Sequence, residues 1–215
     1  MYIKKHYQII EFAFIVSFFV IPPLMTNPVK GFVFSNSFST AGIIYFLMSL
    51  ILYFQETWCN MPERKVSVFF KNVVNSSYFF KTFGLLVVFA ATLDFILEVL
   101  HVNSIVQPSF ESVNILLVIL IFLLTSFSEE IIYRLYLPSF LHRFIKAPTV
   151  VLEAVPVLVF ALAHRYMGYA PVINALFAGV VLRRCYVKSS SILTTFFAHF
   201  AYNVFMFFLY YCRLF

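Results

Sequence analysis

Charged residues are scarce in this chain. Asp, Glu, Lys and Arg make up 11% of its 215 residues, whereas a soluble domain carries about 25%. Hydrophobic residues make up 62%, and the mean hydropathy is +0.93. At that level apolar side chains cannot be confined to one face of each element, so lipid must cover much of the surface. The composition therefore excludes a soluble globular protein and a disordered chain.

Cysteine is rare as well. The three cysteines, Cys59, Cys185 and Cys212, have no paired or CxxC spacing, which argues against a disulfide framework and against a thiolate metal site. The net charge is +6, and in a membrane chain an excess of Lys and Arg marks cytoplasmic loops more often than a nucleic-acid surface. We therefore expect no nucleic-acid partner.

Apolar segments of helical length recur along the whole chain. At roughly 20 residues per span, the length allows six to eight spans and leaves no room for a separate soluble domain. The pattern predicts an all-α polytopic membrane protein of about seven transmembrane helices, forming one transmembrane domain over residues 1–215. The expected segments are 1–25, 40–58, 78–100, 112 to beyond 130, 149–166, 170–186 and 190–211.

Basic residues are distributed unevenly between the connections of these segments. With a cytoplasmic N-terminus, only Lys30, Arg165 and Arg213 of the 15 Lys and Arg fall on the outer side. The bias survives if Arg134 lies inside a helix, because orientation follows Lys and Arg in short loops. We predict an integral multi-pass membrane protein with a cytoplasmic N-terminus, which in a bacterium would lie in the plasma or inner membrane.

Three polar motifs interrupt the apolar segments of the second half. An ionisable residue inside a membrane segment costs about 2.5–3.5 kcal/mol, so such a cluster needs partners or a watery cavity and indicates function. Each motif contains a pair of residues four positions apart that share a helix face: Glu130 and Arg134, Phe160 and His164, His199 and Asn203. The motifs are Glu129-Glu130-x-x-x-Arg134 in the fourth segment, Phe160-x-x-x-His164 in the fifth and His199-x-x-x-Asn203 in the last.

The depths of the three motifs agree. At about 1.5 Å rise per residue, Glu129, His164 and His199 lie roughly 21, 24 and 15 Å from the inner ends of their helices. The three sites can therefore meet in one plane. This requires the fourth helix to continue beyond Arg134 despite Pro138, with a kink.

The three motifs, in this order and on three membrane helices, resemble the CAAX protease and bacteriocin-processing family of intramembrane endopeptidases, which is related to the type II CAAX prenyl endopeptidases. The resemblance covers about residues 120–210, and the core four helices that carry the motifs span 112–211. It implies a hydrolase that cleaves a peptide bond of a membrane-associated or lipidated peptide or protein within the bilayer. Membrane lipid is the other expected partner.

The resemblance also implies roles for individual residues. Glu129 and His164 would activate the attacking water, and His199 and Asn203 would stabilise the oxyanion. Phe160 would support the site, as would the pair Glu130 and Arg134, although Glu130 is sometimes treated as catalytic in such proteins. The chemistry is sensible by itself, since amide hydrolysis needs a base, a carbonyl polariser and a proton donor. Glu129 is the better candidate for the base if Glu130 holds the arginine.

Two questions stay open at this point. Two His and one Glu are also the ligands of many catalytic zinc sites, so Glu129, His164 and His199 would be the ligands if zinc is bound. The same polar network can instead be structural, in a catalytically silent bacteriocin self-immunity protein or a membrane scaffold. A transporter or proton relay is a third class, but the sequence has no inverted repeat to support it.

Two acidic residues lie outside the three motifs in the third segment. Asp94 and Glu98 are four positions apart near its outer end, where we expect both to be solvated at the membrane interface.

Overall fold

The computed structural model describes residues 2–27, 32–33, 40–59, 74–101, 108–109 and 114–213. In the first half the helical elements are α1 (Tyr2–Ile15), η1 (Val16–Val20), α2 (Ile21–Met25), α3 (Thr40–Phe54), η2 (Gln55–Cys59) and α5 (Ser76–Val99). In the second half they are α6 (Ile115–Glu130), η3 (Ile131–Tyr136), α7 (Leu137–Phe144), α8 (Thr149–Ala163), η4 (Arg165–Met167), α9 (Tyr169–Ser189) and α10 (Ile192–Arg213). Two two-residue strands, β1 (Phe32–Val33) and β2 (Pro108–Ser109), pair in parallel.

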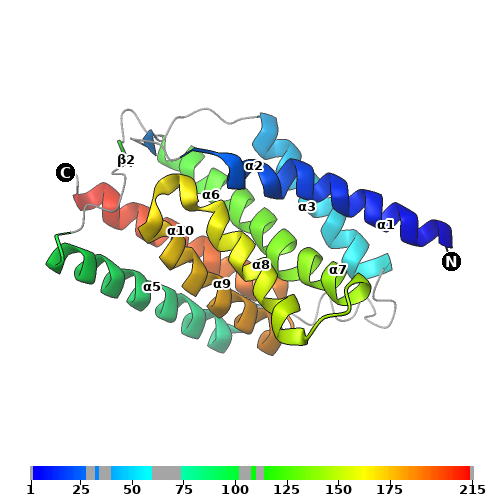
Figure 1. The fold of residues 1–215 in the computed structure, drawn as a ribbon. Helices are drawn as coiled ribbons and strands as arrows, with labels where there is room; N and C mark the ends of the chain where they lie inside the picture. Colours follow the sequence, from blue (N-terminus) through cyan, green and yellow to red (C-terminus); the bar gives the residue numbers. More distant parts are fainter. Residues whose placement is uncertain are drawn as a thin grey trace.

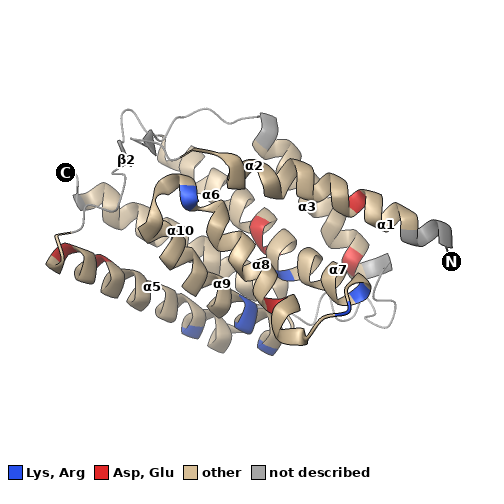
Figure 2. Ribbon diagram, viewed as in Figure 1, with Lys and Arg blue, Asp and Glu red and all other residues tan. Residues whose placement is uncertain are grey.

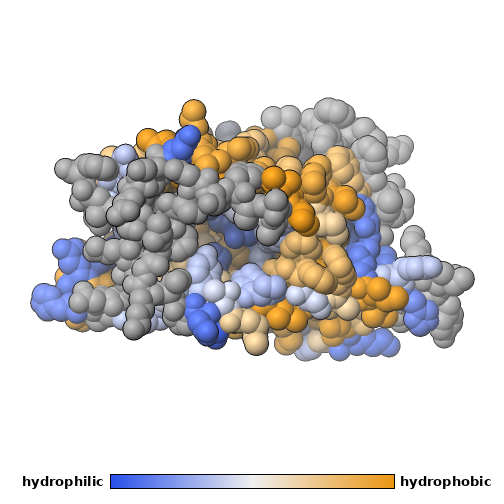
Figure 3. Space-filling model, turned by 90° about the horizontal axis from the view of Figure 1, so that it is seen from above, coloured by the Kyte–Doolittle hydropathy of each residue, from blue (hydrophilic) through white to orange (hydrophobic). Residues whose placement is uncertain are grey.

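The predicted membrane architecture is confirmed. Six helices of the described residues are long and apolar enough to cross a bilayer, and a shorter apolar helix spans Gly42–Thr57. Large apolar side chains on them are exposed, among them Val150 at 79%, Leu116 at 78% and Phe80 at 68%. Such exposure is unfavourable in water and favourable in lipid. The protein is an integral multi-pass membrane protein, and Figure 3 shows hydrophobic side chains spread across the middle of one face.

The long helices run side by side as a bundle (Figure 1). Helix α10 packs against α5, α6 and α9, α8 packs against α9, and α3 packs against the other side of α6. Helix α6 therefore lies between the N-terminal helices and the rest of the bundle. Glu129 of its polar motif lines a cavity on each of two sides, which matters for the site described below.

The fourth predicted helix continues through Pro138, as the site requires. Residues Ile115–Phe144 form one span of 30 residues in which the π-helix η3 joins α6 to α7. Pro138 lies in the first turn of α7, directly after η3, and Arg134 O, which a proline at position 138 cannot bond, accepts from Arg183 Nη1 instead. The wider turn of η3 accommodates the strain without breaking the helix, and such π-helical turns are frequent at functional sites.

The fifth span covers Thr149–Met167, in agreement with the predicted 149–166, but only its first part is α-helical. Helix α8 stops at Ala163, and His164 is its C-terminal cap, with its N–H bonded to Ala161 O at 3.1 Å. The chain then makes the short 3-10 helix η4 and turns at Gly168, whose φ of 106° favours glycine because it has no Cβ. His164 is therefore at a helix end, beside the turn that leads into α9.

The charged residues of α5 lie toward its two ends. Lys81 lies near the start of α5, and Asp94 and Glu98 lie near its end (Figure 2). Since no membrane accompanies the structure, the cytoplasmic N-terminus stays a prediction.

Candidate active site

The two adjacent glutamates of α6 have different environments. The side chain of Glu130 is 0% exposed, whereas that of Glu129 is 24% exposed and lines a cavity. Glu130 Oε2 lies 3.5 Å from Arg134 Nε, and the Arg134 side chain is also fully buried. This ion pair neutralises Glu130 and leaves Glu129 as the carboxylate that a substrate or a water can reach.

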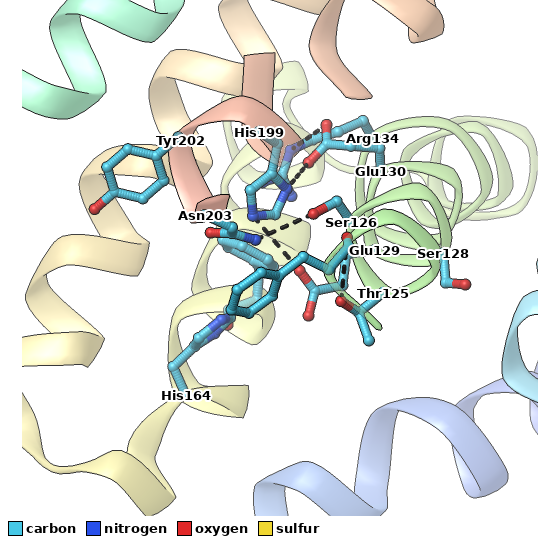
Figure 4. Close-up of polar contacts among 12 residues, drawn as sticks. Thr125, Ser126, Ser128, Glu129, Glu130, Arg134, His164, His199, Tyr202 and Asn203 are labelled. Carbon is cyan, nitrogen blue, oxygen red and sulfur yellow. Dashed lines mark hydrogen bonds and ion pairs between the residues drawn. The ribbon is translucent and has the colours of Figure 1, made fainter. Parts of the chain in front are cut away.

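His199 connects the two glutamates from α10. Its Nδ1 lies 2.9 Å from Glu130 Oε1, and its Nε2 lies 3.7 Å from Glu129 Oε2 (Figure 4). A carboxylate can only accept, so Nδ1 carries the proton of the shorter contact. The second carboxylate thus orients the imidazole and directs Nε2 toward Glu129 and the cavity.

His164 is oriented by the backbone of its own helix. Its Nδ1 lies 2.8 Å from Phe160 O, and since a carbonyl only accepts, Nδ1 is the donor. In the neutral ring the lone pair is then on Nε2, the nitrogen that can accept a proton or a hydrogen bond from water.

Phe160 packs against three members of the cluster. Its ring centroid lies 4.7 Å from that of His164, 6.1 Å from that of His199 and 4.2 Å from Arg134 Cζ. The ring is 1% exposed and holds the guanidinium by a cation–π contact. Phe160 therefore links the two histidines to the buried ion pair.

Asn203 lies one turn beyond His199 on the same face of α10. Its Nδ2 donates to Ser126 Oγ at 3.1 Å, so a hydroxyl of α6 orients the carboxamide. Figure 4 shows Ser126 toward the cluster and Ser128 pointing away from it. All seven residues predicted for the site therefore gather in one region, although no direct bond joins His164 to the glutamates in the described structure.

Two cavities meet at this region. We call the first the α10 cavity; it has a volume of about 420 Å³ and is bordered by α5, α6, α9 and α10. The second, the α1–α3 cavity, has about 670 Å³ and is lined mainly by apolar residues of the N-terminal helices, including Phe14, Phe18 and Met48. Glu129, His164 and Tyr166 line both. These shared residues can be reached from two sides of α6.

The α10 cavity contains polar groups that the motifs did not identify. Asp94, Thr125, Tyr166, Asn174, Tyr202 and Tyr210 all line it. Asn174 Nδ2 donates to the Tyr202 hydroxyl at 2.7 Å, and the Tyr210 hydroxyl donates to Asp94 Oδ2 at 3.0 Å. Position along α10 is the one signal that could have found the tyrosines, because Tyr202 and Tyr210 lie three and eleven residues after His199.

The three residues considered for zinc do not fit a metal site in this arrangement. Among the residues that the structure describes, no group of three or more His, Cys, Asp or Glu side chains could hold a metal ion. With their Nδ1 atoms bonded to Phe160 O and Glu130, His164 and His199 could bind a metal only through Nε2, and the described structure does not bring these atoms and Glu129 into such a group. The geometry thus gives no support to zinc binding by Glu129, His164 and His199.

A second charged group stabilises the helix that carries the glutamates. Arg183 of α9 bonds to both carboxylate oxygens of Glu153 and donates through Nη1 to Arg134 O at 2.7 Å. His142 Nε2 lies 2.8 Å from the same Glu153. These contacts connect α7, α8 and α9 to η3, and none of the three residues lines either cavity.

The fold and the site together define a class of protein: a polytopic membrane protein with a carboxylate–imidazole cluster at a cavity inside its helical bundle. Comparison with known families extends this. Residues 111–205 match the family described as "Type II CAAX prenyl endopeptidase Rce1-like", which confirms the resemblance indicated by the motifs. No curated protein and no solved structure matches the chain. The family is one of CAAX-type membrane proteases, and the matched stretch contains all three motifs.

Proposed function

We propose that this protein is an intramembrane endopeptidase that hydrolyses a peptide bond of a membrane-associated or lipidated peptide or protein. The observation that carries the proposal is the shared position of Glu129 and His164 on both cavities. A carboxylate and an imidazole with a free Nε2 are the groups that activate a water molecule. Membership of the matched stretch in a protease family supports the same reading.

The proposed reaction uses the residues in three roles. Glu129 takes a proton from a water held with His164, and the water oxygen bonds to the carbonyl carbon. Asn203 Nδ2, and His199 in the form that carries a proton on Nε2, donate to the oxyanion as it develops. The C–N bond then breaks while the amine nitrogen receives the proton that Glu129 took from the water, which returns Glu129 to its carboxylate form. Each step needs groups on this chain and water alone, so we propose a glutamate-dependent route.

Glu130, Arg134 and Phe160 have supporting roles in this proposal. Their side chains are at most 1% exposed, so substrate does not reach them in this arrangement. Glu130 orients His199, Arg134 balances the charge of Glu130, and Phe160 packs between them. We infer that the helices of residues 112–211 form the catalytic unit.

The apolar α1–α3 cavity supports a substrate with an apolar group. Its volume of about 670 Å³ and its Phe and Pro lining favour a lipid chain or large hydrophobic side chains over a charged peptide. On this proposal the N-terminal helices close one side of the site and bind the apolar part of the substrate.

The test is cleavage of a library of lipidated and unlipidated membrane peptides by the purified protein in bilayers. Glu129→Gln and His164→Ala should abolish cleavage while the variants stay folded. Glu98→Gln is the matched control for Glu129→Gln, because the exposed Glu98 side chain lies outside the two cavities. Equal activity of the wild type and Glu129→Gln would instead favour the alternative, a structural network in a self-immunity or scaffold protein.

The metal question has its own test. On the glutamate-dependent route, a zinc chelator should leave the cleavage rate unchanged, and the purified active protein should lack stoichiometric zinc. Loss of activity with the chelator, restored by zinc but not by magnesium, would contradict this route.

A further inference from the structure

Asp94 lies on the wall of the α10 cavity. It is half-buried near the end of α5 and lines the same cavity as Glu129 and His199. Its carboxylate accepts a hydrogen bond from the neutral Tyr210 hydroxyl at 3.0 Å. In the part of the chain that the structure describes, no Lys, Arg or His forms a salt bridge with it. Asp94 thus differs from Glu98, which is exposed and does not line the cavity, and their solvation at the membrane interface stays a prediction.

Apart from His164 and His199, the ionisable acids and bases in the described lining of the α10 cavity are all acidic. Its described lining includes two carboxylates, Asp94 and Glu129, and no Lys or Arg. Most of the remaining lining is apolar or aromatic, so the local dielectric is low and the attraction for a cation is strong. A substrate carboxylate would be repelled by the same field. The cavity is therefore suited to a substrate segment with a positive charge.

The two carboxylates lie beside different ends of the α10 stretch that lines the cavity, Asp94 at Tyr210 and Glu129 at His199. Lining residues on α10 recur on one face, from His199 through Asn203 and Met206 to Tyr210. Eleven residues separate His199 from Tyr210, which corresponds to about 16 Å at 1.5 Å per residue. An extended peptide covers this distance with about five residues. Fewer residues are needed if the last of them is a Lys or Arg, because its long side chain covers part of the distance to Asp94.

We propose that Asp94 is a specificity residue that binds a Lys or Arg side chain of the substrate, about three to five residues from the cleaved bond. The inference rests on the proposed endopeptidase function and names a feature of its substrate. The Tyr210 hydroxyl orients the carboxylate, and the aromatic and apolar walls between Asp94 and Glu129 hold the intervening residues. Glu98 has no such role, because it lies one turn further along α5, exposed and outside the lining.

The test uses a peptide that the wild-type protein cleaves, capped at both ends so that only side chains carry charge. A single Lys replaces each residue in turn on both sides of the cleaved bond, and kcat/KM is measured for the full chain in bilayers. The expected profile has a maximum three to five positions from the bond on one side. The best Lys peptide should exceed its norleucine counterpart by about tenfold, which is the effect of one partly buried ion pair.

Variants at Asp94 test whether this residue causes the maximum in kcat/KM. Asp94→Asn keeps an acceptor for the Tyr210 hydroxyl but removes the charge. It should therefore reduce kcat/KM for the Lys peptide to the value for the norleucine peptide. Asp94→Lys should reverse the preference in favour of a Glu at the same position. Glu98→Gln is the matched control and should keep the wild-type profile. A Lys maximum that survives in Asp94→Asn, or a flat wild-type profile, would overturn the proposal.

Binding separates this proposal from the proposed function. The affinity of Glu129→Gln for the Lys and norleucine peptides is measured in the same bilayers, with and without Asp94→Asn. If no peptide is cleaved by the wild type, the endopeptidase proposal fails, and a Lys preference in binding that depends on Asp94 would still support the cation site. Equal affinity for the Lys and norleucine peptides would contradict the proposed cation site at Asp94.

Discussion

His199 lies between two carboxylates, with Nδ1 2.9 Å from Glu130 and Nε2 3.7 Å from Glu129. The two glutamates are neighbours in sequence, yet one is buried behind the imidazole and the other faces the cavities. We therefore expect substitution of Glu129 to reduce activity and substitution of Glu130 to reduce stability.

Glu129→Gln should lower the cleavage rate by at least about 100-fold without lowering the thermal stability, because it removes a base at an accessible position. Glu130→Gln should lower the stability by about 3–5 kcal/mol, because Arg134 then lacks its buried counter-charge. Peptide cleavage and thermal unfolding of the two variants, measured side by side in the same detergent or bilayer, distinguish them. Similar unfolding temperatures for the two variants would contradict the assignment.

The buried pair itself should be strongly coupled. Arg134→Met alone leaves Glu130 without its arginine at 0% exposure and should cost about as much as Glu130→Gln. The double variant should be destabilised by less than the sum of the single variants, because no uncompensated charge remains. Unfolding free energies of the four proteins give the coupling. Simple additivity would mean that the pair contributes nothing through its charges.

Ser126 should influence catalysis through Asn203. Removing its hydroxyl in Ser126→Ala frees the Asn203 carboxamide and should lower kcat several-fold with little effect on KM, because the oxyanion donor loses its orientation. Ser128→Ala is the matched control, since Ser128 is two residues away, equally buried and bonded to Leu124 O. A drop in kcat for both variants, or for neither, would argue against the positioning role.

Gly179 should be intolerant of a side chain behind Phe160. A Cβ there would lie 3.0 Å from Val157 Cγ1 and 3.5 Å from Phe160 Cδ1, so α8 and α9 would have to move apart. We expect Gly179→Ala to cost about 1–3 kcal/mol of stability. Gly84→Ala in α5 has open space around its Cβ and should stabilise its helix by up to about 1 kcal/mol. Thermal unfolding of the two variants checks both signs.

Cysteine labelling tests the orientation in the membrane. With a cytoplasmic N-terminus, a membrane-impermeant thiol reagent should label the exposed Cys212 from the outer side and Cys59 from the cytoplasmic side. Cys185 is buried and should stay unlabelled from both sides until the protein is unfolded. Labelling of Cys212 from the cytoplasmic side in oriented vesicles would reverse the predicted topology.

Much of the fold was predictable because its signals are local. Runs of about 20 apolar residues identify membrane helices without knowledge of their neighbours. The i,i+4 spacing likewise places Glu130 with Arg134, and His199 with Asn203, on common helix faces. The sequence did not predict the π-helix η3, because its turn depends on how α6 and α7 pack around Pro138, nor the end of α8 just before His164.

By itself, the sequence determined the membrane class, the seven apolar segments and the three motifs, since hydropathy and helical spacing are properties of short stretches. Only the tertiary structure decided which glutamate is accessible, because both lie on one helix and the packing of His199 and Arg134 covers just one of them. The same holds for Asp94 and Glu98, which look alike in sequence. Cavities form between helices that are far apart along the chain, so no local pattern records them.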